Sequence, residues 1–183
     1  MERQKTDKNF SAETYLNLSK QNFKFSSAHF LIFNQTDAEM LHGHNYQVVV
    51  KVYPDPNFKM DELGYFIDFS ALKSKIKFLC DQWDEHVLLP ELHQDMKYKI
   101  SSDQKNYEII FRDRFYSLPK NEVIWLKINN TSVEQLSKVF AENLAVELKS
   151  SAVAKIKVTI EETLGQSATT VLMTSIFNTL SLT

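Results

Sequence analysis

Glycine and cysteine are scarce in this chain, whose 183 residues include 3 glycines and 1 cysteine. Glycine makes up about 7% of an average protein, and Gly43, Gly64 and Gly165 are too far apart to form a Gly-rich phosphate-binding loop. A single cysteine excludes a disulfide framework and a cysteine-rich zinc site. Any phosphate group that this protein binds would therefore contact side chains or helix N-termini.

The chain also lacks a long apolar run and a strong net charge. No stretch approaches the roughly 18 consecutive apolar residues of a membrane span, and the first residues are polar rather than an apolar signal core. We therefore expect a cytoplasmic protein that does not contact a membrane. The net charge of −2 argues against a nucleic-acid partner. A hydrophobic content of 43% is that of an ordinary globular protein.

The hydrophobic pattern predicts one α+β domain over residues 21–175, with an antiparallel sheet and helices on one face. A polar arm over 1–20, with a short helical piece around Tyr15–Leu18, should precede it, and a tail over 176–183 should follow. The predicted order is β-β-α-insertion-α-β-β. The insertion covers about 91–127 and contains a hairpin around 101–106. The predicted strands cover 22–33, 41–53, 155–163 and 168–173, with a further extended stretch over 123–128.

Two amphipathic helices are expected. The first has Asp68 or Ser70 as its N-cap and the apolar stripe Leu72, Ile76, Leu79, Cys80 and Trp83. Cys80 should therefore pack in the core rather than act as a nucleophile. The second helix should start at Thr131, with Glu134 closing a capping box.

The sharpest chemical feature is the pair His42 and His44, separated by Gly43. Residues two apart on a strand share a face, so both histidines should point to the apolar side of their strand. His29 ends the preceding strand, and antiparallel pairing would bring it beside them. Three neutral imidazoles with one open position form a catalytic zinc site. Two strand histidines with local partners are the alternative. We expect Gly43 to be needed because a side chain there would crowd the opposite face.

A second candidate is the sequence W-D-E-H, which includes Asp84 and His86 at the end of the first helix. An aspartate can orient a histidine that moves protons. The alternative is a solvated helix terminus. His93 is a lone histidine in a polar loop, where we expect a surface position.

Two glutamates complete the candidates. Glu162 continues the apolar parity of Ile156, Val158 and Ile160, and a carboxylate on an apolar face needs a partner rich in hydrogen-bond donors. A heterocycle with paired N–H groups would supply one, unless the strand has ended and Glu162 is exposed. Glu39 lies three residues before His42, at the mouth of the expected metal site.

Six motifs occur in order between about Asn22 and Leu172: F-S-S-A-H-F (25–30), L-H-G-H-N-Y (41–46), G-Y-F-I-D-F-S-A-L-K (64–73), W-D-E-H-V-L-L-P (83–90), N-T-S-V-E-Q-L (130–136) and I-E-E-T (160–163). Together they resemble the 6-pyruvoyl-tetrahydropterin synthase family, which includes the bacterial 6-carboxy-tetrahydropterin synthases of queuosine biosynthesis. The first 20 residues, much of 91–127 and the tail after Met173 lie outside the resemblance.

The resemblance implies the tunnelling fold, in which β-β-α-α-β-β subunits form a trimeric barrel. Two trimers stack into a homohexamer with active sites at subunit interfaces. It implies a zinc ion held by three histidines: His29, His42 and His44. It also implies a pterin ring anchored by Glu162, with help from Thr131 and Ser132. The implied substrate is 7,8-dihydroneopterin triphosphate, which loses triphosphate or is cleaved in its side chain.

Two positions depart from the usual family pattern. Usual members have a cysteine, acting as general base, shortly before H-G-H, whereas residues 37–40 here read D-A-E-M. A type III variant, similar to the parasite enzyme, has a glutamate three residues before the first histidine, where Glu39 stands. That variant makes mainly 6-hydroxymethyl-7,8-dihydropterin for folate synthesis. The family's Asp-His pair reads Asp84-Glu85 here, with the histidine displaced to His86.

The leading hypothesis is thus a zinc-dependent pterin lyase of the type III kind, with Glu39 as general base and Asp84 and His86 in proton transfer. Its product would be 6-hydroxymethyl-7,8-dihydropterin or 6-pyruvoyl-tetrahydropterin. One alternative is the 6-carboxy-tetrahydropterin synthase of queuosine biosynthesis. The others are a non-catalytic relative that binds a pterin or a purine, and a structural α+β protein with incidental histidines.

Overall fold

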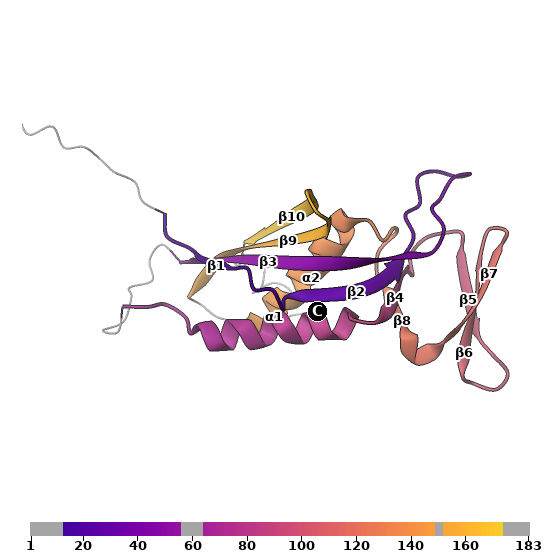
Figure 1. Ribbon diagram of the computed structural model, residues 1–183, viewed down its shortest axis with the longest axis horizontal. Coiled ribbons are helices and arrows are strands. Elements are labelled where there is room, and N and C mark those ends of the chain that lie inside the picture. The colour runs from indigo at the N-terminus through magenta and orange to yellow at the C-terminus, as the bar shows by residue number, and fades with distance from the viewer. Residues whose placement is uncertain (1–12, 56–63, 149–151, 174–183) are drawn as a thin grey trace, which may run out of the picture.

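The structure is a computed structural model that describes residues 13–55, 64–148 and 152–173. It confirms the α+β fold. A seven-stranded sheet carries two α-helices on one face, and a three-stranded sheet lies at one end of the molecule (Figure 1). The expected features at 1–12 and 176–183 and most of the turn before Gly64 fall outside the described residues. No helix among those residues is long and apolar enough to cross a membrane.

The elements follow the chain in the expected order. The helices are α1 (Phe69–Trp83) and α2 (Val133–Leu148). The strands of the large sheet are β1 (Leu16–Leu18), β2 (Lys24–His29), β3 (His42–Pro54), β4 (His86–Pro90), β8 (Val123–Leu126), β9 (Val153–Thr163) and β10 (Gln166–Met173). The small sheet contains β5 (Met96–Ile100), β6 (Asn106–Phe111) and β7 (Arg114–Pro119), and a short 3₁₀ helix (Lys120–Glu122) leads back into β8.

The large sheet has the order β10-β9-β3-β2-β4-β8, with β1 paired to the far half of β3. Its pairs are antiparallel, except that β2–β4 and β4–β8 are parallel. The expected antiparallel sheet is therefore present and extended by two parallel strands. The first of these is V-L-L-P with His86 before it, and the second is the extended stretch at 123–126.

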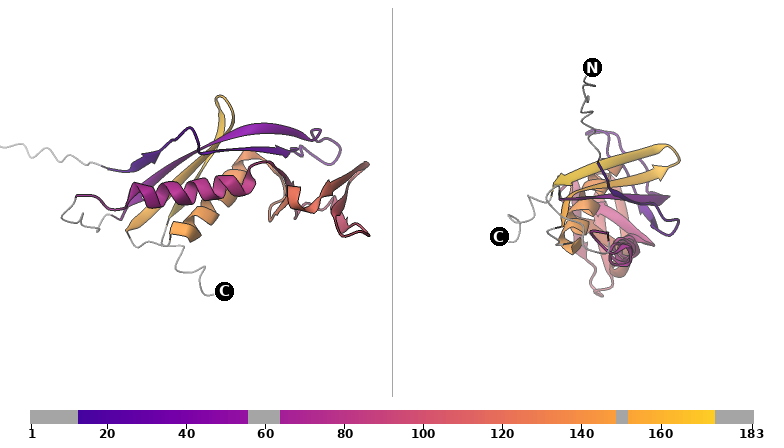
Figure 2. Two further views of the ribbon diagram at one scale, coloured as in Figure 1. Left: turned by 60° about the horizontal axis from the view of Figure 1, so that its bottom comes forward. Right: turned by 90° about the vertical axis from the view of Figure 1, so that its left-hand side faces the viewer.

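The core lies between the large sheet and the helices. Tyr46, Val48, Val50 and Val52 alternate along β3, and each is completely buried. They face the stripe of α1, which includes Leu72, Ile76 and the buried Cys80 as predicted. Both helices pack side by side on this face (Figure 2). Alternation on the strands and a helical period on the helices thus produce one apolar layer.

Asp68 is the N-cap of α1, as expected, because its carboxylate accepts a 2.8 Å hydrogen bond from the amide of Ser70. The prediction for α2 was wrong in detail. The helix begins at Val133, and the hydroxyl of Thr131 donates to the carbonyl of Phe30 rather than capping the helix. The local pattern assigned this hydroxyl to a helix cap, but it bonds instead to the residue that follows β2.

The helical piece expected around Tyr15–Leu18 was also wrong. Residues 16–18 form β1, which pairs with Val50–Val52 of β3. Leu18 is 3% exposed and belongs to the main core. Burial against β3 therefore decides the conformation of a segment whose own pattern is too short to do so.

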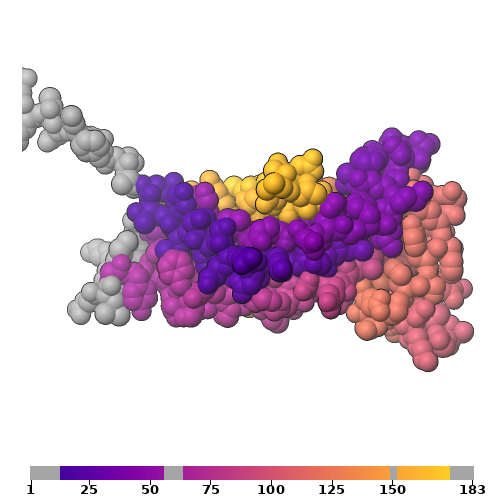
Figure 3. Space-filling model, viewed as in Figure 1, coloured from indigo at the N-terminus to yellow at the C-terminus, as the bar shows by residue number. Residues whose placement is uncertain are grey.

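The insertion folds into the small sheet, with its hairpin at the expected place. It has a core of its own, where Phe111 and Ile109 pack with Phe30 and Ile32, which follow β2. In the space-filling view the insertion and the segment between β2 and β3 meet at one end of the molecule (Figure 3). The insertion thus packs against the part of the chain that precedes His42.

Candidate metal centre and active site

Three histidines converge at the ends of β2 and β3. His29 pairs directly with His42 across the two strands, and His44 is two residues further along β3 on the same face. One ring nitrogen from each histidine lies within 4.8 Å of the others. The predicted approach of His29 to the H-G-H motif is therefore confirmed.

Hydrogen bonds to main-chain carbonyls fix two of the rings. Nδ1 of His29 lies 2.9 Å from the carbonyl oxygen of Thr131, and Nδ1 of His42 lies 2.8 Å from that of Met40. A carbonyl only accepts, so each Nδ1 carries the proton and each Nε2 presents a lone pair. Metal-binding histidines typically donate their other ring N–H to an acceptor in this way.

The three Nε2 atoms point at a common centre. Nε2 of His42 and Nε2 of His44 are 2.9 Å apart, and Nε2 of His29 is buried without a hydrogen-bond partner among the described residues. Zinc–nitrogen bonds of about 2.0–2.1 Å place tetrahedral ligands about 3.3 Å apart. The unpartnered buried nitrogen of His29 and the closely spaced ring nitrogens of His42 and His44 fit a bound cation that takes one lone pair from each.

Burial keeps His29 in its neutral form. Desolvation is the main reason that the pKa of His29 lies below its ordinary value, and the neighbouring His42 and His44 lower it further. The hydrogen bond to Thr131 and the carboxylate of Glu162 act in the opposite direction. Neutral imidazole is the form that binds metal ions.

Glu162 lies beside the histidine cluster rather than in open solvent. Its Oε1 is 3.2 Å from Nε2 of His29 and 4.0 Å from Nε2 of His44, and its side chain is 21% exposed. The hydroxyl of the fully buried Tyr46 donates a 3.1 Å hydrogen bond to the same oxygen. Burial first, and this carboxylate second, raise the pKa of Tyr46 far above its ordinary value. The carboxylate is thus held beside the histidine cluster by its Oε1 atom.

Glu39 also lies beside the cluster, next to His42. Its Oε2 is 3.8 Å from Nε2 of His42 and accepts a 2.9 Å hydrogen bond from the amide of Leu31. One third of its side chain is exposed. A partly exposed carboxylate beside a metal site can both meet a substrate and accept its proton.

Thr131 and Ser132 directly precede α2, and Thr131 contacts His29. Thr131 is completely buried, its hydroxyl donates to Phe30 and its carbonyl orients His29. Ser132 hydrogen-bonds Glu134 and lowers the pKa of that carboxyl group. Thr131 therefore orients His29, and contact between these two residues and a substrate stays a prediction.

Asp84 and His86 form a separate group. Oδ1 of Asp84 accepts a 2.7 Å hydrogen bond from the amide of Ser26, and Nδ1 of His86 donates to the carbonyl of Asp84 at 2.6 Å. Glu85, with φ at 60°, turns the chain between α1 and β4. Within the described ranges, no polar contact joins Asp84 or His86 to Glu39, Glu162 or the three histidines.

A pocket of about 360 Å³ lies beside this second group. Its walls include Glu85, His86, Gly43 and Asn45. Gly43 and Asn45 alternate with His42 and His44 along β3, and His44 also lines the pocket. Gly43 is not required for space, because an added Cβ would meet Ser27 at 3.5 Å, an ordinary contact. The expected crowding at this position was wrong.

Sequence reasoning missed three residues that support the site. Strand parity places Tyr46 on the face of His42 and His44, but its hydrogen bond to Glu162 was not predicted. Asn130 holds the backbone of Ile32 through both ends of its side-chain amide. Arg114 of the insertion donates to the carbonyls of Ala38 and Glu39, and no local pattern indicates that contact.

A profile of the 6-pyruvoyl tetrahydropterin synthase family matches residues 17–171. This chain belongs to that family. A Methanocaldococcus jannaschii protein provisionally named 6-carboxy-5,6,7,8-tetrahydropterin synthase is 33% identical over 148 residues, which cover 79% of this chain and 87% of the relative. Tetrahydropterin synthases are lyases, so the predicted enzyme class is confirmed.

Solved structures of two parasite enzymes share the fold. The 6-pyruvoyl tetrahydropterin synthases of Plasmodium vivax and Plasmodium falciparum are 30% and 31% identical to this chain, each with a TM-score of 0.79. Each comparison covers 89% of this chain and 99% of the other. Two further P. vivax structures are of variants in which a catalytic residue, a glutamate, is replaced by alanine or by cysteine.

Proposed function

We propose that this protein is a zinc-dependent lyase of 7,8-dihydroneopterin triphosphate that removes triphosphate, cleaves the side chain, or does both. The observation that carries the proposal is the carboxylate of Glu39, 3.8 Å from Nε2 of His42. The chain's one cysteine is buried in the main core on α1. A carboxylate, not a thiol, is therefore the group available as base beside the metal.

His29, His42 and His44 would hold the zinc ion. When bound, zinc supplies a Lewis acid that stabilises negative charge developing on the oxygens of the substrate side chain. Three protein ligands leave a fourth position open to substrate, as in catalytic zinc sites. The tautomers set by Thr131 and Met40 keep two of the Nε2 atoms ready for the metal.

Glu39 would act as the general base that removes a proton from the substrate side chain. Its partial exposure allows contact with the substrate, and its hydrogen bond from Leu31 fixes its direction. The catalytic glutamate of the P. vivax enzyme supports this role. We expect the type III product, 6-hydroxymethyl-7,8-dihydropterin, ahead of 6-pyruvoyl-tetrahydropterin.

Glu162 would anchor the pterin ring. A carboxylate accepts two parallel N–H bonds from a heterocycle, and the hydrogen bond from Tyr46 holds Glu162 in place. Ser132 would add a contact near the start of α2. The helix N-terminus also offers amide groups to an anion.

Assembly into a homohexamer, with sites between subunits, would give Asp84 and His86 a role. They lie away from the histidine cluster of their own chain, so we propose that their proton transfer serves a neighbouring copy. The large sheet ends on β10 and β8 in the described part of the chain. Strand edges of this kind are surfaces on which copies can pair.

The test is incubation of the zinc-loaded protein with 7,8-dihydroneopterin triphosphate, with the pterin products identified by chromatography and mass. A dominant 6-hydroxymethyl-7,8-dihydropterin product supports the type III function. A dominant 6-carboxy product would instead support the second candidate, 6-carboxy-tetrahydropterin synthase, which the name of the M. jannaschii relative favours. Pterin binding without turnover would support the non-catalytic alternative.

A further inference from the structure

The segment that carries Glu39 is a small hairpin between β2 and β3, which we call the Glu39 hairpin (residues 31–39). Ile32 and Ala38 bridge its two sides, and the amide of Glu39 donates a 2.9 Å hydrogen bond to the carbonyl of Leu31. The amide of Leu31 donates in turn to the Glu39 carboxylate at 2.9 Å. The direction of the carboxylate therefore depends on the backbone of the hairpin.

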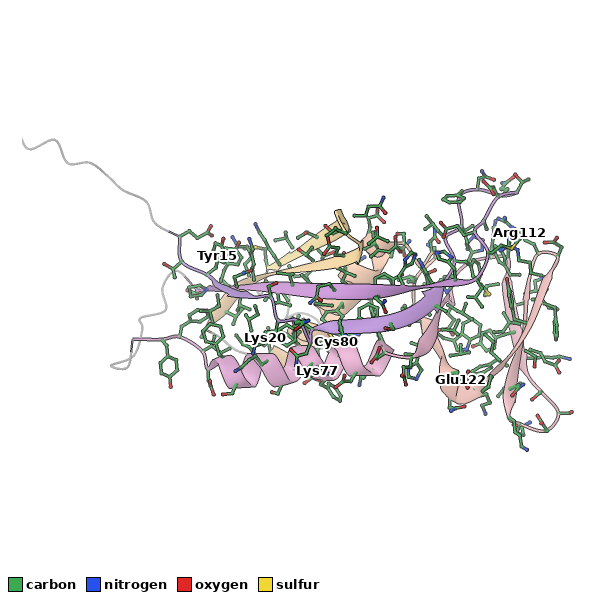
Figure 4. All side chains as sticks on the ribbon, viewed as in Figure 1. Tyr15, Lys20, Lys77, Cys80, Arg112 and Glu122 are labelled. Atoms are coloured by element: carbon green, nitrogen blue, oxygen red, sulfur yellow. The ribbon has the colours of Figure 1, made fainter. Side chains whose placement is uncertain are left out.

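Two arginines of the insertion hold this hairpin from outside. Nη2 of Arg114 donates to the carbonyl of Ala38 at 2.8 Å, and its Nη1 donates to the carbonyl of Glu39. Nη2 of Arg112 donates to the carbonyl of Asn34 at 2.5 Å. Figure 4 shows Arg112 at the end of the small sheet that faces the hairpin. The insertion thus hydrogen-bonds both the tip of the hairpin, at Asn34, and the backbone of Glu39.

Both arginines are themselves fixed. They flank the β6–β7 turn beside Phe111, which is completely buried in the core of the insertion. The guanidinium carbons of Arg112 and Arg114 lie 4.8 and 5.8 Å from the centre of that ring. Nε of Arg112 also donates to Asp95 at 2.9 Å, and Arg112 has a left-handed φ of 56°. Non-glycine residues adopt this conformation at a cost, which the contacts of Arg112 offset.

We propose that Arg114, assisted by Arg112, is a positioning residue that fixes the Glu39 carboxylate for proton abstraction. This inference rests on the proposed function of Glu39 and assigns the small sheet a part in the reaction. Two donors of one planar guanidinium on successive carbonyls fix the peptide between them, a geometry that the single point charge of lysine does not reproduce. A base displaced by 1 Å lowers turnover by up to about 100-fold.

The experiment compares Arg114→Ala, Arg114→Gln and Arg114→Lys with Lys99→Ala as the matched control. Lys99 lies on the same small sheet and pairs with Glu108, away from the hairpin. We expect kcat to fall about 10- to 100-fold in Arg114→Ala, with KM, zinc content and the product unchanged. Arg114→Gln retains an N–H donor on a shorter side chain and should fold even if Arg114→Ala does not. Arg114→Lys should recover only part of the rate.

A double-mutant cycle separates positioning from general support. In the Glu39→Gln background, Arg114→Ala should cause no further loss of turnover, because its effect passes through the Glu39 carboxylate. Independent losses in the two variants, or wild-type kcat in all three Arg114 variants, would overturn the proposal.

Hydrogen exchange tests the same contact without substrate. The amides of Leu31 and Glu39 should exchange faster in Arg114→Ala and at the wild-type rate in Lys99→Ala. Unchanged exchange in the Arg114 variants would overturn the proposal. If the wild-type protein converts no pterin, the proposed function fails. Faster exchange of the Leu31 and Glu39 amides in Arg114→Ala would still show that Arg114 stabilises the hairpin.

Discussion

The hydroxyl of Tyr46 donates a 3.1 Å hydrogen bond to Oε1 of Glu162, although 116 positions separate the two residues. Tyr46 lies on β3 beneath the histidines and Glu162 lies near the end of β9. The bond ties the expected pterin anchor to the strand that carries two of the proposed metal ligands. Binding of the ring and binding of the metal therefore depend on one rigid pair of strands.

Glu162→Gln should weaken pterin binding about 10- to 100-fold, the usual loss for a hydrogen bond to a charged group, about 1.5–3 kcal/mol. Tyr46→Phe should cause a smaller loss, about 3- to 10-fold, because it removes one neutral donor from the carboxylate. Fluorescence titration with 7,8-dihydroneopterin measures both. Glu161→Gln is the control, because Glu161 bonds the amide of Gly165 instead. Loss of zinc in Glu162→Gln would show that Glu162 is a metal ligand rather than an anchor.

Purified protein should contain one zinc ion per chain, measured by atomic absorption. Alanine at position 29, 42 or 44 should remove it, since each histidine supplies one ligand nitrogen. His93→Ala should retain full zinc content. Chelation should lower the melting temperature, because a ligand present at 100 times its Kd stabilises the folded state by about 2.7 kcal/mol. Stoichiometric zinc in the His42→Ala and His44→Ala variants would contradict the assigned site.

Glu39→Gln should reduce kcat by about 10²- to 10⁴-fold, the contribution of a positioned general base. Zinc content and pterin affinity should remain as in the wild type, because neither the histidines nor Glu162 is altered. Asp37→Asn, in the same hairpin, should have wild-type kcat. Turnover by Glu39→Gln at the rate of Asp37→Asn would rule out Glu39 as the base.

Cys80 should resist thiol reagents at pH 8 in the folded protein. Burial is the main reason that its pKa is raised from 9.0 to about 12, so the reactive thiolate is scarce. The folded state then binds the proton more tightly than the unfolded state. The corresponding stability is complete below pH 9 and decreases as the pH rises toward 12. Urea unfolding across this range should show a steeper decline for the wild type than for Cys80→Ala, and equal slopes would contradict the prediction.

The sequence predicted the histidine cluster because each part of it follows a local rule. Strand alternation places His42 and His44 on one face, and a short antiparallel connection brings His29 opposite. The same kind of rule placed Asp68 at the start of α1 and Cys80 in the core.

Several of the failures involve partners distant in the chain. Thr131 bonds the carbonyl of Phe30, 101 positions away, instead of capping α2. Arg114 reaches Glu39 across 75 positions. Periodicity shows which face of an element is buried, but it does not show which other element covers that face. The parallel pairing of β4 with β2 and the short strand β1 were missed for this reason.

The direct pairing of His29 with His42 has a consequence for folding. A shift of one residue between β2 and β3 would turn one set of histidines to the opposite face of the sheet. The three nitrogens then could not share one centre. A bound metal ion would therefore stabilise only the correct register of β2 and β3. Metal binding would select the correctly folded chain before any substrate binds.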